Sequence, residues 1–234
     1  MEKTIADITT YYGPLLATQA LDMGAIRLSP HDPFQWASGY RMPIYNDNRQ
    51  FLAKPQSRAL ISEAFEAMLE ALRFVPDCVS GTATAGIPHA TTLADRLRLP
   101  LSYVRSSGKD HGLHNVIEGL GQDGSYHKAK VLLIEDLIST GGSSIKAVEA
   151  IMAAQGVVPY CLAIFTYGLK ASVEAFAALV PECRPVSILD YDIMVDTARK
   201  SGYVDDTGAA LLAEWRKDPF GWGTAHGFSP IVKE

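Results

Sequence analysis

The sequence contains little cysteine and no pair of cysteines at a spacing that binds metal. Only three of its 234 residues are cysteines, and Cys78, Cys161 and Cys183 lie far apart, each in or beside an apolar run. This pattern predicts buried free thiols and a protein of the reducing cytoplasm. The chain also has no apolar run long enough to span a membrane, and its start predicts a polar and apolar helix instead of a secretion signal.

An excess of positive charge is absent as well. Lys and Arg number 21 against 26 Asp and Glu, which gives a formal net charge of -5. No overall field therefore recruits nucleic acid, and an anionic ligand has to be bound by local groups. The sequence shows no internal repeat and no low-complexity linker. The length and a hydrophobic content of 47% predict a single domain over residues 1–234.

The most informative stretch is residues 131–144, where an apolar run ends in two acids and a turn that contains glycine. The aliphatic residues 131–134 are typical of a parallel strand buried on both faces. Apolar residues then recur at helical spacing from residue 145 to residue 152. Strand, loop and helix in this order put the loop at the carboxyl end of the strand. Open α/β sheets bind ligands there, and a helix N-terminus favours an anion.

This loop has two parts that suit different parts of one ligand. Glu135 and Asp136 would repel a phosphate, but they accept hydrogen bonds from vicinal hydroxyls. The residues that follow offer backbone N–H groups and hydroxyls to a phosphate: Thr140, Gly141, Gly142, Ser143 and Ser144. The pattern therefore favours a ribose with a 5-phosphate. The alternative is an ordinary strand-to-helix connection with an acidic first turn.

A second segment, residues 105–119, holds few core residues and several cations. Arg105, Lys109 and His111 offer positive charge to a diphosphate, and the glycines of the segment allow it to fold over a ligand. We therefore expect this segment to be mobile without ligand. The alternative is a solvated surface loop. His111 and His114 do not predict a metal site, because no thiol or carboxylate completes a set of ligands.

Two further glycine patterns resemble nucleotide-binding motifs, but the residues around them do not match what those motifs require. Gly81 and Gly86 have the spacing of a triphosphate-binding loop, but Ile87 and Pro88 stand where Lys and Ser or Thr are required. What remains is a small-residue loop after a strand, able to lie against a diphosphate through its backbone. Residues 119–124 match GxGxxG, but they precede a strand instead of following one, which excludes a dinucleotide site.

The segment around residues 24–50 is rich in turns and predicts a small antiparallel flap. Phe34, Trp36 and Tyr40 either cover a flat heterocycle or, as aromatic side chains more often do, pin the flap to the domain. Apolar spacing elsewhere predicts helices over residues 5–21, 55–72, 90–97, 172–179, 190–198 and 207–215, and strands over residues 78–80, 101–105, 160–167 and 186–189. The tail from Asp218 receives no predicted task.

Together these segments resemble the orotate phosphoribosyltransferases, which belong to the type I phosphoribosyltransferases. The resemblance covers nearly the whole chain and is carried, in order, by residues 34–39, 85–88, 103–105, 109–112, 117–119 and 135–143. It implies an α/β fold with a central, mostly parallel sheet flanked by helices and a small N-terminal hood over the acceptor site. It also implies transfer of 5-phosphoribosyl from phosphoribosyl diphosphate to orotate with Mg²⁺, a step of pyrimidine (UMP) biosynthesis in a cytoplasmic homodimer.

The resemblance implies roles for individual residues. Arg105, Lys109 and His111 would contact the diphosphate, and Ser139 would contact orotate. In the dimer the basic segment would reach the neighbour's site, and Mg²⁺ would lie on the diphosphate and the ribose hydroxyls without a ligand from the protein. The catalytic residues would be Lys109, Asp110, His111 and Asp136. The ribose phosphate would be held by Glu135, Asp136, Leu137, Ile138, Ser139, Thr140, Gly141, Gly142 and Ser143.

The sequence departs from the family mainly at positions expected to contact the acceptor, orotate. Ala37 and Ala85 stand where many members have lysine, Ser106 replaces another lysine, and residues 166–168 lack an arginine that some members use on orotate. Two alternatives stay open: a phosphoribosyltransferase for another nucleobase, and a regulator that only senses phosphoribosyl diphosphate. Residues 109–111 argue against a sensor, because a sensor needs no leaving-group chemistry.

Overall fold

The structure is a computed structural model that describes residues 3–36, 38–105 and 116–228. At its centre lies a six-stranded sheet with the strand order β10-β9-β8-β5-β6-β7. The edge strand β7 is antiparallel to β6, and all other neighbours are parallel. This sheet confirms the predicted fold class. Its strands are β5 (Cys78–Thr82), β6 (Leu101–Val104), β7 (Ile117–Glu118), β8 (Lys130–Ile138), β9 (Val157–Thr166) and β10 (Arg184–Asp190).

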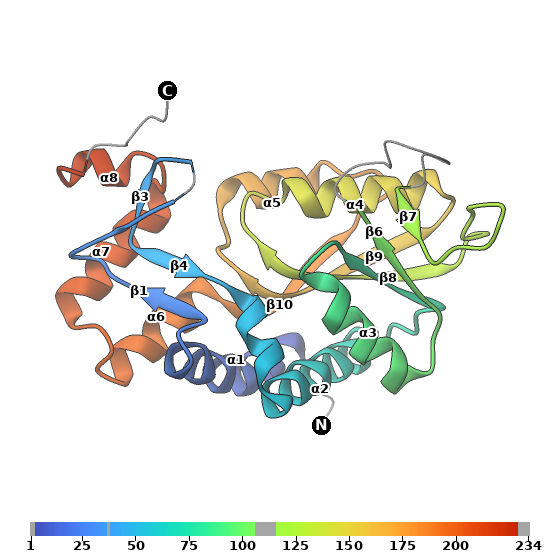
Figure 1. Cartoon of the computed structure of the whole chain (residues 1–234), viewed down its shortest axis with the longest axis horizontal. Coiled ribbons are helices and arrows are strands. Elements are labelled where there is room, and N and C mark those ends of the chain that lie inside the picture. Colours follow the sequence, from blue (N-terminus) through green and yellow to red (C-terminus); the bar gives the residue numbers. More distant parts are fainter. Residues whose placement is uncertain (1–2, 37, 106–115, 229–234) are drawn as a thin grey trace.

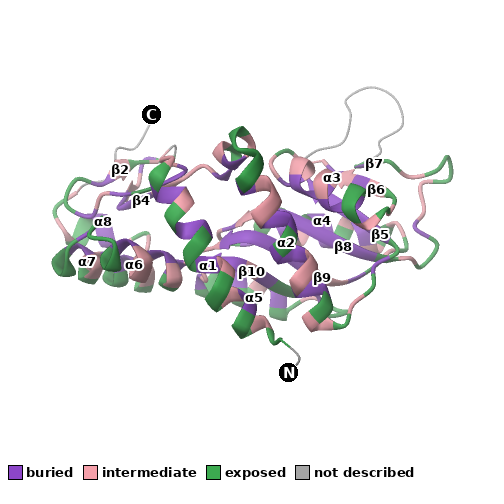
Figure 2. Cartoon of the chain, turned by 90° about the horizontal axis from the view of Figure 1, so that it is seen from below, coloured by how far each residue is buried: buried purple, intermediate pink, exposed green. Residues whose placement is uncertain are grey.

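Helices cover both faces of the sheet, which explains why its central strands are so apolar. Leu132 and Ile134 of β8 pack into one core, and Val131 and Leu133 pack into the other. Figure 2 shows β8 and β9 as mostly buried, with exposed residues on the outer helices. One face carries α1 (Ile5–Asp22), α2 (Pro55–Leu72) and α3 (Gly86–Leu97), and the other carries α4 (Gly142–Ala153) and α5 (Lys170–Ala177) (Figure 1).

Local signals in the sequence explain where several helices begin. Thr4 and Asp7 form a capping box at the start of α1, and Pro55 is the first residue of α2. The Asp190 side chain accepts a hydrogen bond from the backbone of Ile193 at the start of α6 (Tyr191–Lys200). Each arrangement satisfies or avoids an unpaired N–H group of the first turn.

The predicted flap is present as two small antiparallel sheets, which we call the hood. One pairs β1 (Ile26–Leu28) with β4 (Ile44–Asn46), and the other pairs β2 (Phe34–Gln35) with β3 (Arg41–Met42). A 3₁₀ helix, η1 (Asn48–Ala53), leads from the hood into α2. The hood lies at one end of the molecule, beside α7 (Asp206–Lys217) and α8 (Trp222–Ala225) (Figure 1).

The aromatic residues of the flap have packing partners, which favours the pinning alternative. The Trp36 indole N–H donates to the Ile44 carbonyl at 3.0 Å, and its ring lies 6.2 Å from that of Tyr167. The Tyr40 ring lies 5.2 Å from that of Phe220 in the tail. The tail, for which the sequence predicts no task, therefore holds the hood in place.

Two predictions from composition can also be compared with the structure. Cys78, Cys161 and Cys183 are free and buried, as expected. Within the described residues, no helix is both long enough and apolar enough to cross a membrane.

Candidate active site

A cavity of about 470 Å³ opens at the carboxyl ends of β5 and β8. Its walls come from residues 46–49 after the hood, residues 82–85 after β5, and residues 135–143 at the end of β8. Three connections that are far apart in the sequence therefore meet at one edge of the sheet, as expected for parallel strands. The predicted ribose-phosphate loop and the second small-residue loop lie in the same cavity.

Glu135 lies inside β8 and not after it, because β8 stays paired with β9 as far as Ile138. Its side chain is only 3% exposed. Its carboxylate accepts hydrogen bonds from Thr82 Oγ1 at 2.6 Å, from Ser144 Oγ at 3.0 Å and from the Asp136 N–H at 3.0 Å. Glu135 thus ties the β5 loop and the first turn of α4 to β8, while its contact with a ribose stays a prediction.

Asp136, the second acid, has an altered affinity for its proton. Burial, followed by the charge of Glu135, raises the pKa of Asp136 to about 7. The carboxyl group therefore holds its proton more tightly than an ordinary aspartate. From the hood side, Asn48 Nδ2 donates to the Asp136 carbonyl at 2.6 Å, which fixes the backbone of the acid. A ligand that supplies hydroxyl donors or a cation would favour the ionised form.

The start of α4 is suited to an anion. Gly141 has a φ of 87°, a left-handed conformation that glycine adopts without strain. No side chain of the described residues caps α4, so its first N–H groups are available to a phosphate. Ser144 is an exception to the expected phosphate contacts, because its buried hydroxyl donates to Glu135.

Close packing beneath the cavity requires Gly86. A Cβ atom there would lie 2.5 Å from Thr82 Oγ1 and 2.6 Å from the Ile134 carbonyl oxygen. Glycine thus lets α3 approach β8 directly below the acids. Thr82 is a partner of Glu135 that the sequence does not predict, since nothing in the local sequence links residues so far apart.

The sequence analysis also missed Asn48 and Arg49. The signal for them exists, because residues 47–49 form a polar run directly after β4. Arg49 Nε is paired with Asp47 Oδ1 at 2.6 Å.

The cations predicted for the diphosphate are only partly described. Arg105 lines an adjoining cavity of about 200 Å³ together with Lys146, Ser143 and Thr82, and Ser143 and Thr82 belong to the main cavity as well. Arg105 Nη1 lies 3.4 Å from Glu118 Oε1. The structure therefore brings Arg105 close to the phosphate loop and adds Lys146. Six residues named from the sequence lie outside the described residues: Ala37, Ser106, Lys109, Asp110, His111 and His114.

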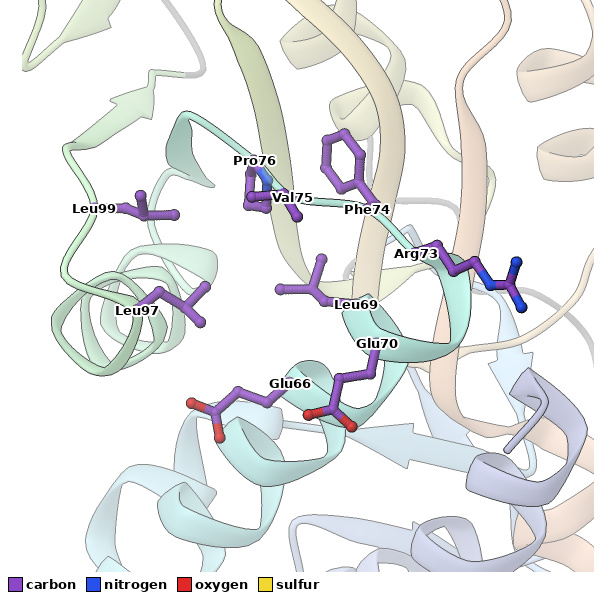
Figure 3. A pocket seen from close by; sticks show the side chains of 9 residues that line it. All are labelled: Glu66, Leu69, Glu70, Arg73, Phe74, Val75, Pro76, Leu97 and Leu99. Atoms are coloured by element: carbon purple, nitrogen blue, oxygen red, sulfur yellow. The ribbon is translucent and has the colours of Figure 1, made fainter. Parts of the chain in front are cut away.

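A larger cavity, of about 680 Å³, lies at the opposite edge of the sheet. Figure 3 shows its walls, which come from the end of α2, the connection into β5 and the end of α3. This connection enters β5 at its amino end, so the cavity is remote from the glycine loops. Its lining is mostly apolar, and its charged residues are two acids, Glu66 and Glu70, and one cation, Arg73, so it offers a phosphate no excess of positive charge. We therefore assign the chemistry to the smaller, polar cavity.

A mostly parallel sheet with a hood, and a cavity that joins two acids to the start of a helix, are features of the phosphoribosyltransferase class. A family model described as phosphoribosyl transferase domain matches residues 47–167. The orotate phosphoribosyltransferase of Bacteroides fragilis is 44% identical over 212 residues, which cover 90% of this chain and 96% of that protein. That of Bacillus caldolyticus is 43% identical over 210 residues, 89% of this chain and 98% of that protein.

Solved structures agree with the sequence comparisons. The crystal structure of orotate phosphoribosyltransferase from Aeropyrum pernix superposes with a TM-score of 0.67 at 27% identity, covering 81% of this chain and 99% of that one. The chain belongs to the phosphoribosyltransferase family and, within it, to the orotate phosphoribosyltransferases.

Proposed function

We propose that this chain transfers the 5-phosphoribosyl group of phosphoribosyl diphosphate to orotate, giving orotidine 5'-monophosphate and diphosphate in UMP biosynthesis. The observation that carries the proposal is the cavity that joins Asp136, the uncapped start of α4 and residues 82–85. The name shared by relatives that are 42 to 44% identical supports orotate as the acceptor.

The roles of the described residues follow from their chemistry. The 5-phosphate would accept hydrogen bonds from the backbone of Gly142 and Ser143, where the dipole of α4 favours an anion. Asp136 would accept a hydrogen bond from a ribose hydroxyl. The diphosphate would lie along residues 82–85, near Arg105 and Lys146.

The reaction asks for charge stabilisation more than covalent chemistry. The bond from the ribose C1 to the diphosphate oxygen breaks, and the orotate ring nitrogen forms the new bond to C1. Positive charge develops on the sugar and negative charge on the leaving oxygens, as in other glycosyl transfers. We expect Lys109, Asp110 and His111 to act on the leaving diphosphate, with Arg105 as a described partner. Ser139 would help to hold orotate in line for attack.

We also expect a Mg²⁺ ion on the diphosphate and the ribose hydroxyls. Burial raises the pKa of Asp136 to about 7, so a cation bound nearby on the ribose hydroxyls would favour the ionised form of this carboxyl group. The bound ion supplies a charge that neutralises the departing diphosphate. The homodimer, with residues 109–111 acting across it, and the cytoplasmic location are further parts of this proposal.

An acceptor assay tests the function. Purified protein is incubated with phosphoribosyl diphosphate and Mg²⁺, and diphosphate release is measured with orotate, uracil, xanthine or adenine. We expect release that depends on orotate. Release with a purine alone would show a different phosphoribosyltransferase, and binding of phosphoribosyl diphosphate without release with any base would show a sensor.

A further inference from the structure

Orotate carries a carboxylate that uracil lacks, so an orotate site needs a cation placed for it. Among the described residues that line the main cavity, Arg49 is the one cation, and it is paired with Asp47. Ala85 and residues 166–168 offer no positive charge. The sequence departures therefore leave open which residue binds the carboxylate.

Arg216 of α7 reaches the carboxyl edge of the sheet from outside the predicted motifs. Its Nη2 atom lies 3.0 Å from the position that a Cβ atom would occupy on Gly168. Gly168 follows β9, and its neighbour Tyr167 donates a backbone hydrogen bond to the carbonyl of Ile138 at 3.1 Å. Ile138 directly precedes Ser139. The guanidinium thus lies over the end of β9, the strand next to the predicted acceptor contact, and glycine at position 168 leaves room for it.

Packing fixes α7 in this position. Trp215 is 1% exposed, and its indole N–H donates to Met42 Sδ of the hood at 3.0 Å. Its ring lies 5.5 Å from the ring of Tyr167, and the Tyr191 hydroxyl donates to the Leu212 carbonyl at 3.0 Å. Figure 1 shows α7 beside the hood. Arg216 therefore projects from a fixed helix between the hood and the sheet.

The guanidinium keeps donors available. Nη1 donates to both carboxylate oxygens of Asp192, each at 2.6 Å. Nε and Nη2 have no hydrogen-bond partner in the part of the chain that the structure describes, and the side chain is 35% exposed. An arginine that is held through one nitrogen and open at the others suits a second carboxylate.

We propose that Arg216 binds the carboxylate of orotate and determines the preference for orotate over uracil. The proposal rests on the proposed function, since it names the acceptor contact of that reaction. The competing explanation is that Arg216 only ties α7 to α6 through Asp192. An ion pair with Asp192, which is 68% exposed, contributes little to stability, so the two explanations predict different variants to be defective.

The test compares Arg216→Gln with the matched control Asp192→Asn, which removes the ion pair and keeps the cation. Arg216→Gln should raise KM for orotate by about 10- to 100-fold, the range for loss of a charge-assisted hydrogen bond. KM for phosphoribosyl diphosphate and the melting temperature should stay close to wild type. Arg216→Lys should recover part of the loss, and Asp192→Asn should leave KM for orotate nearly unchanged. The ratio of kcat/KM for orotate to that for uracil should fall in Arg216→Gln alone.

The outcomes separate this proposal from the function on which it rests. Equal defects in Arg216→Gln and Asp192→Asn would show a structural tie, and an unchanged KM for orotate in Arg216→Gln would exclude the contact, with the function intact. A wild-type protein without orotate-dependent diphosphate release would overturn both.

Discussion

The two edges of the central sheet differ in whether their polar groups have partners. At the amino edge, the larger cavity has mostly apolar walls, and Arg96 pairs with Glu66 beside it. At the carboxyl edge, the smaller cavity holds an uncapped helix start and a carboxyl group with a raised pKa. Such features cost folding free energy, and proteins retain them where a ligand compensates for the cost. Cavity size alone would therefore direct attention to the wrong edge.

The largest expected effect comes from replacing a carboxylate with an amide, and the same replacement is made at each edge of the sheet. Asp136→Asn at the carboxyl edge should lower kcat/KM by on the order of 10²-fold or more, because it removes an acceptor for the ribose. Glu70→Gln at the amino edge should change kcat/KM by less than about 2-fold, since exposed substitutions away from a site are nearly neutral. Steady-state kinetics with orotate measures both. Equal losses would contradict the assignment of the chemistry to the carboxyl edge.

A second substitution tests Lys109, which lies outside the described residues. Lys109→Ala should lower kcat by on the order of 10²-fold, because it removes a charge that stabilises the leaving diphosphate. Its melting temperature should stay near that of wild type.

Mixing Lys109→Ala with Asp136→Asn then tests the proposed dimer. If each site takes Lys109 from its neighbour, one site of a mixed dimer carries both defects and the other carries none, so activity returns. No recovery after verified subunit exchange would show that Lys109 serves its own chain.

The third prediction separates the two adjacent acids by their effect on stability. Glu135→Ala leaves the fully buried Ser144 hydroxyl without its acceptor and removes the shorter of the two hydrogen bonds of Thr82 Oγ1, which keeps the Ile134 carbonyl at 3.3 Å. The expected loss is about 2–4 kcal/mol in the free energy of unfolding. Denaturant unfolding measures it, with Asp136→Asn as the comparison. A loss in Asp136→Asn as large as that in Glu135→Ala would show that both acids are structural.

The last prediction concerns the dependence of stability on pH. Because the folded protein raises the pKa of Asp136 to about 7, the folded state holds a proton that the unfolded state has released. Stability therefore falls as pH rises from the ordinary aspartate range to about 7 and changes little above it. Asp136→Asn lacks this penalty, so its melting temperature should exceed that of wild type by several degrees at pH 8 and match it near pH 4. A difference that is independent of pH would contradict the raised pKa.

Local patterns in the sequence predicted the elements of the fold and the loops of the site. The apolar run before Glu135, the glycines of the following loop and the caps of the helices act over a few residues, so they can be recognised without the structure. Boundaries were less certain, because pairing across the sheet extends β8 to Ile138 and begins β9 at Val157.

Contacts between distant segments were beyond the sequence. The hydrogen bonds of Thr82 to Glu135 and of Asn48 to the Asp136 carbonyl join segments that only the folded sheet and hood bring together. The approach of Arg216 to Gly168 likewise depends on how α7 packs against the hood. The roles inferred for Lys109, Asp110 and His111 stay predictions from family resemblance.

The hydrogen bond from Trp215 to Met42 links two stretches that both fall outside residues 47–167, the part matched by the family model. The matched part contains the loops suited to the phosphorylated sugar, whereas the hood and the last helices flank the place proposed for the base. The hood and the last helices would then determine together which base the protein accepts. To change the acceptor preference by exchanging segments between relatives, both the hood and the last helices would have to be exchanged together. Either segment alone would pack against a segment that had evolved with another partner.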